Sequence, residues 1–212
     1  AWPKDGPRQL WKRPLGDGYS AILCKGDSLF TAYHDQGDEV VIALDSKTGA
    51  TRWEQRQKVE FWKDMTKAFG PGPNATPLLM GGRLMHIGID GRMRCLDAST
   101  GKPLWAKDLN GQFGRRKRVE EYGYSGSPLA YRDTVIVLVG GDASAVVALN
   151  PADGAVVWGS ESGGVSYAPA AILTLAGVEQ YIYFEPEGVV ALNPRTGETL
   201  WRSPIQFNNG NH

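Results

Sequence analysis

The chain of 212 residues carries 23 lysines and arginines against 23 aspartates and glutamates, so its formal net charge is zero. This balance provides no global attraction to nucleic acid or to an anionic membrane surface. No run of about 18 apolar residues is present, which excludes a transmembrane helix. The 27 glycines and 13 prolines favour many short strands joined by tight turns.

The first predicted element in chain order is an N-terminal segment, residues 1–18, which is rich in proline, glycine and charge. Leu10–Arg13 within it is a candidate outer strand, and no signal peptide is found at Ala1. Trp11 lies about one repeat length before the first full copy of the phrase described next. We therefore interpret it as the end of a further copy.

A phrase of eleven residues organises the chain, because it occurs four times at intervals of roughly 40–50 residues. Its copies are Ala43–Trp53, Cys95–Trp105, Ala148–Trp158 and Ala191–Trp201. In each copy an Asp or Asn can bond the backbone of a turn, and a glycine stands where the chain needs a positive φ. We expect the closing tryptophan to pack against the neighbouring unit, as a structural joint rather than a catalytic motif. The predicted docking residues are Trp11, Trp53, Trp105, Trp158 and Trp201, with Gly49, Gly101, Gly154 and Gly197.

Apolar runs separated by turn residues predict four strands in each unit, which is the number in a propeller blade. The predicted strands are Ser20–Cys24, Ser28–Tyr33, Glu39–Leu44 and Thr51–Gln55; Thr76–Leu79, Arg83–Gly88, Gly91–Leu96 and Pro103–Lys107; Ser127–Tyr131, Thr134–Val139, Ala143–Leu149 and Val156–Gly159; and Ala168–Leu175, Glu179–Phe184, Gly188–Leu192 and Thr199–Arg202. The resulting division is 1–18 with one outer strand, 19–56 for blade 1, 57–108 for blade 2 with an insert, 109–160 for blade 3 with an insert, 161–203 for blade 4, and 204–212 as a tail or the start of a missing blade. No helix is predicted with comparable support, although Val59–Phe69 could hold a short one.

The pattern Ala-Leu-Asp-x-x-Thr-Gly-x-x-x-Trp resembles the tryptophan-docking repeat of quinoprotein-like β-propellers, and the resemblance extends from Trp11 to Trp201. That family includes dehydrogenases that use pyrroloquinoline quinone (PQQ), and non-enzymatic relatives such as a lipoprotein of the outer-membrane assembly machinery. The resemblance implies an all-β fold, a β-propeller of four-stranded antiparallel blades. Four blades plus the Trp11 strand fit half of an eight-bladed ring, either as a fragment or paired with a second copy that completes the ring. A closed four-bladed ring is the alternative.

The two longest intervals place extra residues in the links between blades, on the face where propellers of this kind usually bind ligands. A surface of aromatic, basic and small polar side chains there could bind a peptide, a glycan or an anionic ligand. The competing interpretations are that the arginine run is solvated and balanced by Glu120 and Glu121, and that the aromatic rings only pack the insert. The candidate contact residues are Phe61, Trp62 and Lys63 in the first insert, Arg115, Arg116, Arg118, Tyr122 and Tyr124 in the second, and Tyr167 in the third link.

His34 is a further candidate on the same predicted face, where it accompanies Asp35 and Asp38. A histidine beside two carboxylates could ligate a metal or act in acid–base chemistry. No second cluster of this kind occurs, so an ordinary polar turn is favoured and no metal site is predicted. Cys24 and Cys95 are predicted to be small buried side chains in separate strands, without a disulfide.

The resembled dehydrogenases place adjacent cysteines and a calcium ion beside the quinone, and this chain has no Cys-Cys pair. The G-x-S-x-G and H-E-x-x-H motifs of other enzymes are also absent. We therefore expect a non-catalytic binding or scaffold module without a cofactor, whose partner is a protein or a glycan and not nucleic acid. The alternatives are a PQQ- and calcium-dependent dehydrogenase, or a piece of one, and a carbohydrate-binding propeller. The resemblance implies export to the periplasm or cell envelope.

Overall fold

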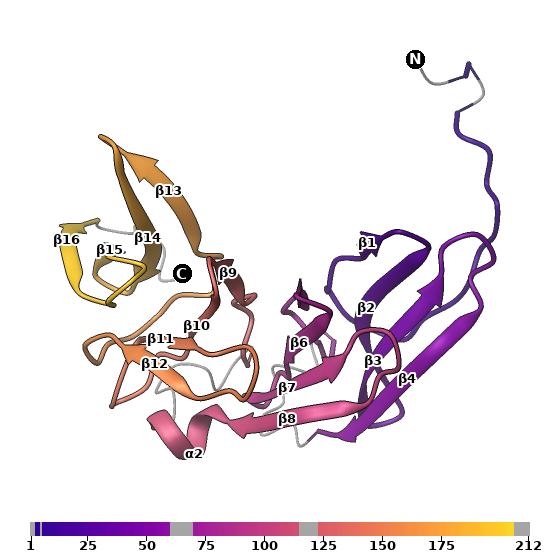
Figure 1. Ribbon diagram of the computed structural model, residues 1–212, viewed down its shortest axis with the longest axis horizontal. Helices are drawn as coiled ribbons and strands as arrows, with labels where there is room; N and C mark the ends of the chain where they lie inside the picture. The colour runs from indigo at the N-terminus through magenta and orange to yellow at the C-terminus, as the bar shows by residue number, and fades with distance from the viewer. Residues whose placement is uncertain (1–2, 5, 60–69, 115–122, 206–212) are drawn as a thin grey trace.

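A computed structural model describes residues 3–4, 6–59, 70–114 and 123–205. The strands in this part of the chain form four antiparallel sheets of four strands each. Each sheet takes four consecutive strands and pairs them in sequence order. The sheets follow one another in a curved row, from β1 in indigo to β16 in yellow (Figure 1). The all-β architecture of four-stranded antiparallel blades is therefore confirmed, and we number the sheets blades 1 to 4 along the chain.

The strands of each blade have the following bounds. Blade 1 contains β1 (Leu23–Lys25), β2 (Ser28–Asp35), β3 (Asp38–Asp45) and β4 (Thr51–Lys58). Blade 2 contains β5 (Leu78–Met80), β6 (Arg83–Ile87), β7 (Arg92–Asp97) and β8 (Pro103–Asp108). Blade 3 contains β9 (Leu129–Tyr131), β10 (Thr134–Leu138), β11 (Val146–Leu149) and β12 (Val156–Gly159). Blade 4 contains β13 (Ala171–Leu175), β14 (Val178–Glu185), β15 (Gly188–Leu192) and β16 (Thr199–Pro204).

Each repeated tryptophan but the last lies on the glycine of the next copy of the phrase. These glycines have φ between +71° and +77°, a conformation that costs glycine little. A Cβ added to Gly101 would lie 2.6 Å from the ring of Trp53, so the turn can approach the indole this closely only because glycine has no side chain. The pairs are Trp11 on Gly49, Trp53 on Gly101, Trp105 on Gly154 and Trp158 on Gly197. Three of the indole N–H groups also donate to the adjoining turn, Trp11 to Ser46 O at 2.9 Å, Trp53 to Ala98 O at 3.0 Å and Trp105 to Pro151 O at 3.0 Å.

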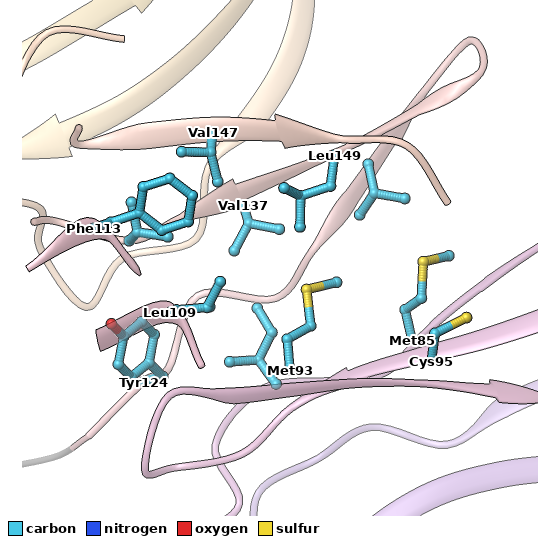
Figure 2. Packing of buried hydrophobic residues seen from close by; sticks show 12 residues of the cluster. Met85, Met93, Cys95, Leu109, Phe113, Tyr124, Val137, Val147 and Leu149 are labelled. Atoms are coloured by element: carbon cyan, nitrogen blue, oxygen red, sulfur yellow. The ribbon is translucent and has the colours of Figure 1, made fainter. Parts of the chain in front are cut away.

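The hydrophobic core is divided among the joints between consecutive blades. Because side chains alternate across a strand, each blade contributes one set of residues to the joint before it and another to the joint after it. Figure 2 shows the joint of blades 2 and 3, where Met85 and Met93 face Val137 and Leu149. The joints of blades 1 and 2 and of blades 3 and 4 hold comparable clusters. Side-chain packing therefore holds consecutive blades together, since in the described residues no backbone ladder runs between the sheets.

The N-terminal segment differs from its prediction. Leu10–Arg13 does not form a strand in the structure, because no strand among the described residues lies beside it to complete a ladder. Trp11 instead packs against the apolar face of blade 1 that includes Val40 and Ile42, both fully buried. Its docking on Gly49 therefore does not depend on a strand.

Trp201 stands apart from the other repeated tryptophans. It is 37% exposed, whereas Trp53 and Trp158 are each 9% exposed. Its indole N–H donates to Gln180 of its own blade at 2.7 Å. In the part of the chain that the structure describes, no further glycine turn lies against it, which explains its exposure.

One short helix was not predicted from the sequence. α2 (Leu109–Phe113) follows β8 directly, and the Asp108 side chain caps it by accepting from Gly111 N at 3.1 Å. Leu109 and Phe113 are buried at one end of the joint shown in Figure 2. The helix that was considered at Val59–Phe69 lies almost wholly outside the described residues. Within the described ranges, no helix has the length and apolar character needed to cross a membrane.

The two cysteines occupy different environments. Cys95 is buried in β7, as predicted, and burial raises the pKa of its thiol to about 11. Cys24 is exposed, so its predicted burial is wrong. It lies on β1, a strand at the edge of its sheet that pairs with β2, and its side chain is on the opposite side of the strand from Leu23, which packs on the core.

The turns of blades 1 and 2 carry an acid-sensitive carboxylate where blades 3 and 4 carry asparagine. Hydrogen bonds from Ser99 and Thr100 lower the pKa of Asp97 to about 2. A carboxyl group whose pKa is lower in the folded state stabilises the fold above its ordinary pKa, and this contribution is lost as the pH falls through about 2. Asn150 accepts the equivalent bond from Ala152 N at 2.9 Å without a charge.

We therefore expect Asp97→Asn to reduce the acid sensitivity of unfolding, because asparagine preserves the turn and removes the titrating group. The measurement is the drop in thermal midpoint between pH 5 and pH 2, followed by circular dichroism. The reciprocal variant Asn150→Asp should enlarge the drop. Equal drops in all three proteins would contradict the assignment of acid sensitivity to this turn.

Candidate binding face

The hairpin turn between the second and third strands of each blade lies at the same end of the sheet as the links between blades. In blade 1 the register pairs Asp35 with Asp38 at the β2–β3 turn and Asp38 with Lys58 at the end of β4. The link that leaves β4 therefore begins beside the β2–β3 turn, and the same topology repeats in the following blades. We call this end of the blades the link face and define it by turns 36–37, 88–91, 139–145 and 186–187, the first link 70–77, the second link 109–114 and 123–128, and the third link 160–170.

The hairpin Gly88–Gly91 of blade 2 contacts both the first and the second link. Ile89 O accepts from Tyr124 N at 3.0 Å. The Ile89 side chain lies against Gly72 of the first link, where an added Cβ would be 2.7 Å from Cδ1. It also lies against Gly123 of the second link, where an added Cβ would clash with Ile89 Cγ1. One side chain therefore holds two segments that lie far apart in the sequence.

A second set of bonds fastens α2 to the same hairpin. Asn110 Nδ2 donates to Asp90 O at 2.7 Å, and Tyr124 Oη donates to Asn110 Oδ1 at 2.8 Å. Leu109 N donates to Gly91 O at 3.1 Å. Tyr124 is only 1% exposed, as its position in Figure 2 illustrates, so we replace its predicted ligand contact with a packing role.

A buried charged cluster lies beneath the hairpin, at the joint of blades 1 and 2. Glu39 from β3 is 2% exposed, and His86 and Arg94 from blade 2 are 0% and 8% exposed. Glu39 Oε1 accepts from His86 Nε2 at 2.7 Å and lies 3.7 Å from Arg94 Nη2. Glu39 Oε2 accepts from Ile89 N at 3.1 Å. One carboxylate therefore joins the two blades and the hairpin.

The charges in this cluster shift one another's protonation. Burial alone would raise the pKa of Glu39, but the attraction and hydrogen bond of His86, the Ile89 N–H and Arg94 outweigh it and hold the pKa below its ordinary value. Burial lowers the pKa of the Arg94 guanidinium, against the opposing effect of Glu39. Burial raises the pKa of Asp90. Glu39 therefore carries a negative charge at neutral pH inside this joint.

The remaining predicted contact residues have mixed positions. His34 is the next-to-last residue of β2 and exchanges backbone bonds with Asp17. Asp35 and Asp38 both pair with Arg56, at 2.8 and 3.1 Å, so these two carboxylates form ion pairs within blade 1. Tyr167 is half-buried in the link before β13. The other candidates lie outside the described residues: Phe61, Trp62, Lys63, Arg115, Arg116, Arg118 and Tyr122.

Sequence reasoning missed the Glu39 cluster. Its members come from two repeats and three strands, so no local motif marks them. A signal that could have found them comes from aligning the repeats by their tryptophans and by the pairing of their strands. The cross-strand pair His86–Arg94 stands where blade 3 has Val137–Val147 and blade 4 has Tyr183–Val190. Charged residues at positions that are apolar in sister repeats indicate a special site.

The described residues do not fit the quinone and calcium site of the dehydrogenases. Cys24 and Cys95 lie in different blades, on β1 and β7, and form no adjacent pair. Across residues 3–4, 6–59, 70–114 and 123–205, no three His, Cys, Asp or Glu side chains gather to hold a metal ion.

Four-stranded blades joined by tryptophan–glycine docking define the class as a β-propeller of PQQ-type repeats. The sequence family described as "Outer membrane protein assembly factor BamB" matches residues 37–212, and the chain belongs to this family.

Individual relatives agree with this assignment. Outer membrane protein assembly factor BamB of Burkholderia pseudomallei (strain K96243) is 27% identical over 150 residues, which are 68% of this chain and 35% of the relative. The crystal structure of BamB from Moraxella catarrhalis superposes with a TM-score of 0.61 at 20% identity, over 92% of this chain and 51% of that one. A europium-containing methanol dehydrogenase gives 0.64 at 16% identity, over 93% and 45%. The two structural matches show the fold alone, and the chain spans about half or less of each relative's length.

Proposed function

We propose that this chain is a non-catalytic scaffold in outer membrane protein assembly, which binds a protein partner through the link face in the cell envelope. Membership of the assembly-factor family is the observation that carries this proposal. The geometry supports it, because the fold uses a core of buried contacts at Ile89 to order two links on one face. Within that face, we propose that the contacts come from Phe61, Trp62, Lys63, Arg115, Arg116, Arg118, Tyr122, Tyr167 and His34.

A partner other than a second copy is favoured by the state of blade 1. A second copy that completed the ring would have to place its exposed Trp201 on a glycine turn of blade 1. Gly49 is the glycine of that turn, and it already packs on Trp11 of its own chain. The position is therefore filled, and we propose a different protein as the partner.

The test is a binding titration with the other purified subunits of the outer membrane assembly machinery of the source organism, held in detergent micelles. Alanine replacement of Arg115, Arg116 and Arg118 together should weaken binding at least about tenfold, because charge-assisted contacts at an interface centre carry much of its energy. Matched controls at the opposite end of the blades are Lys25→Ala and Lys47→Ala, which should change the affinity less than about twofold.

Other outcomes would favour the alternative functions. No binding by the unmodified chain, or equal effects of both sets of variants, would reject the proposal. A change in quinone absorbance when PQQ and calcium are added would instead support a dehydrogenase. Glycan-array binding that disappears in Trp62→Ala would support the carbohydrate-binding alternative.

A further inference from the structure

In the described residues, the joint of blades 1 and 2 contains a set of buried charges whose hydrogen bonds reach the link face directly. Most of this joint is apolar, with Phe30, Val41 and Leu84 buried in it. Taking ions out of water is costly unless specific partners compensate them. The His86–Arg94 pair nevertheless occupies positions that hold aliphatic or aromatic side chains in blades 3 and 4. A structural role beyond simple packing is therefore required to explain it.

Glu39 has such a structural role, because its side chain extends from blade 1 to the backbone of blade 2. Its carboxylate leaves blade 1 and accepts the backbone N–H of Ile89 at 3.1 Å, at the tip of a hairpin that belongs to blade 2. The hairpin approaches so closely that a Cβ on Gly88 would lie 2.8 Å from Glu39 Oε1. His86 holds the carboxylate in this orientation with its 2.7 Å contact, and Arg94 balances its charge.

The same hairpin passes this constraint on to both links. The first link packs its Gly72 on Ile89, and the second bonds Tyr124 N to Ile89 O at 3.0 Å. Asn110 Nδ2 bonds Asp90 O at 2.7 Å and extends the contact to α2. Two hydrogen bonds, both made by the backbone of Ile89, therefore connect Glu39 to Tyr124.

We infer that Glu39, oriented by His86 and Arg94, is a positioning residue for the partner-binding surface: it fixes the Gly88–Gly91 hairpin and through it both links. This inference rests on the proposed function for its binding consequence. Its structural consequence is independent, because the order of the hairpin can be measured without any partner.

The test is amide hydrogen exchange of the full chain, which separates local positioning from overall stability. The main variant is the double replacement Glu39→Met with Arg94→Met, which removes the acceptor for Ile89 N without leaving an uncompensated buried charge. We expect exchange at Ile89 and Tyr124 to accelerate at least about tenfold, while Val147 and Val190 in blades 3 and 4 stay within about twofold. Glu39→Gln serves as a second, milder variant.

Glu187→Gln is the matched control, because Glu187 has the same spacing from its tryptophan in blade 4 but is exposed. It should leave exchange at all four amides unchanged. Uniform acceleration in every blade would reduce Glu39 to a general stabiliser and overturn the inference, as would unchanged exchange at Ile89 and Tyr124.

Binding to the purified assembly subunits is then compared between the unmodified chain and the double methionine variant. A loss of affinity of at least about fivefold is expected if the links must be held in place to bind. Faster exchange with unaltered affinity would overturn the positioning role in binding. If the unmodified chain does not bind these subunits, the proposed function fails, while the exchange result still decides the structural part.

Discussion

Trp53→Ala is expected to lower the free energy of unfolding by about 3–5 kcal/mol, the range for truncating a buried tryptophan. Three contacts are lost together at the joint of blades 1 and 2. The ring stacks on Gly101, its N–H donates to Ala98 O at 3.0 Å, and it lies 6.1 Å from the ring of Phe30 between centroids. Because neighbouring repeats stabilise one another chiefly through such joints, the loss should also uncouple blade 1 from the rest.

Urea unfolding followed by circular dichroism measures this effect, and Trp201→Ala is the control. Trp201 belongs to the same repeat position but is 37% exposed, and its N–H donates to Gln180 of its own blade. Its replacement should cost less than half as much. If the two variants lose the same stability, the docking of tryptophan on the next glycine turn is not what joins the blades.

The joints could be predicted from sequence because each is encoded by a local phrase. The Asx residue, the glycine with positive φ and the tryptophan lie within eleven residues, and each has a preference that does not depend on distant parts of the chain. The strands could be predicted from the same turn residues, although three of them, β1, β11 and β13, begin three residues later than predicted, at Leu23, Val146 and Ala171. Membership of the propeller class was therefore accessible before any coordinates.

Features that depend on the spatial neighbours of a segment could not be predicted from the sequence. Leu10–Arg13 has the pattern of a strand, but a strand also needs a neighbour, and none lies beside it in the described residues. Cys24 has apolar neighbours in sequence yet sits on the uncovered edge strand β1. The segment that forms α2, with Asp108 as its N-cap, has the sequence of an ordinary loop. Only the burial of Leu109 and Phe113 in the structure explains why it is helical.

The binding face shows the same division. Sequence identified the links as the place where extra residues gather, since the intervals between tryptophans are longest there. The sequence placed Tyr124 among the candidate ligand contacts, because an aromatic ring beside glycines and serines fits a binding loop as well as it fits a packed link. Only the contact of its ring with Gly91 and its bond to Asn110 show that it fastens the link instead. The Glu39 cluster could not be predicted from the sequence, because its residues come together only where two blades pack against each other.

Glu39→Met alone is expected to destabilise the fold by about 3–5 kcal/mol, because it leaves the Arg94 charge buried without its partner. Adding Arg94→Met should restore part of that loss, since it removes the uncompensated charge and places an apolar side chain where blades 3 and 4 have Val147 and Val190. Recovery should remain incomplete. His86 Nε2 and Ile89 N both lose their acceptor, and an unsatisfied buried donor costs about 1–3 kcal/mol.

Urea unfolding of the two single variants and the double variant forms a thermodynamic cycle that isolates the Glu39–Arg94 interaction. Glu187→Met, at the same spacing from its tryptophan but exposed in the β14–β15 turn, should change stability by less than about 0.5 kcal/mol. A double variant no more stable than Glu39→Met would show that Arg94 does not depend on Glu39 for compensation. Recovery of stability without recovery of hairpin order would separate the two roles of the carboxylate. The charge pair would then account for the cost of burial, and the bond to Ile89 would account for the position of the links.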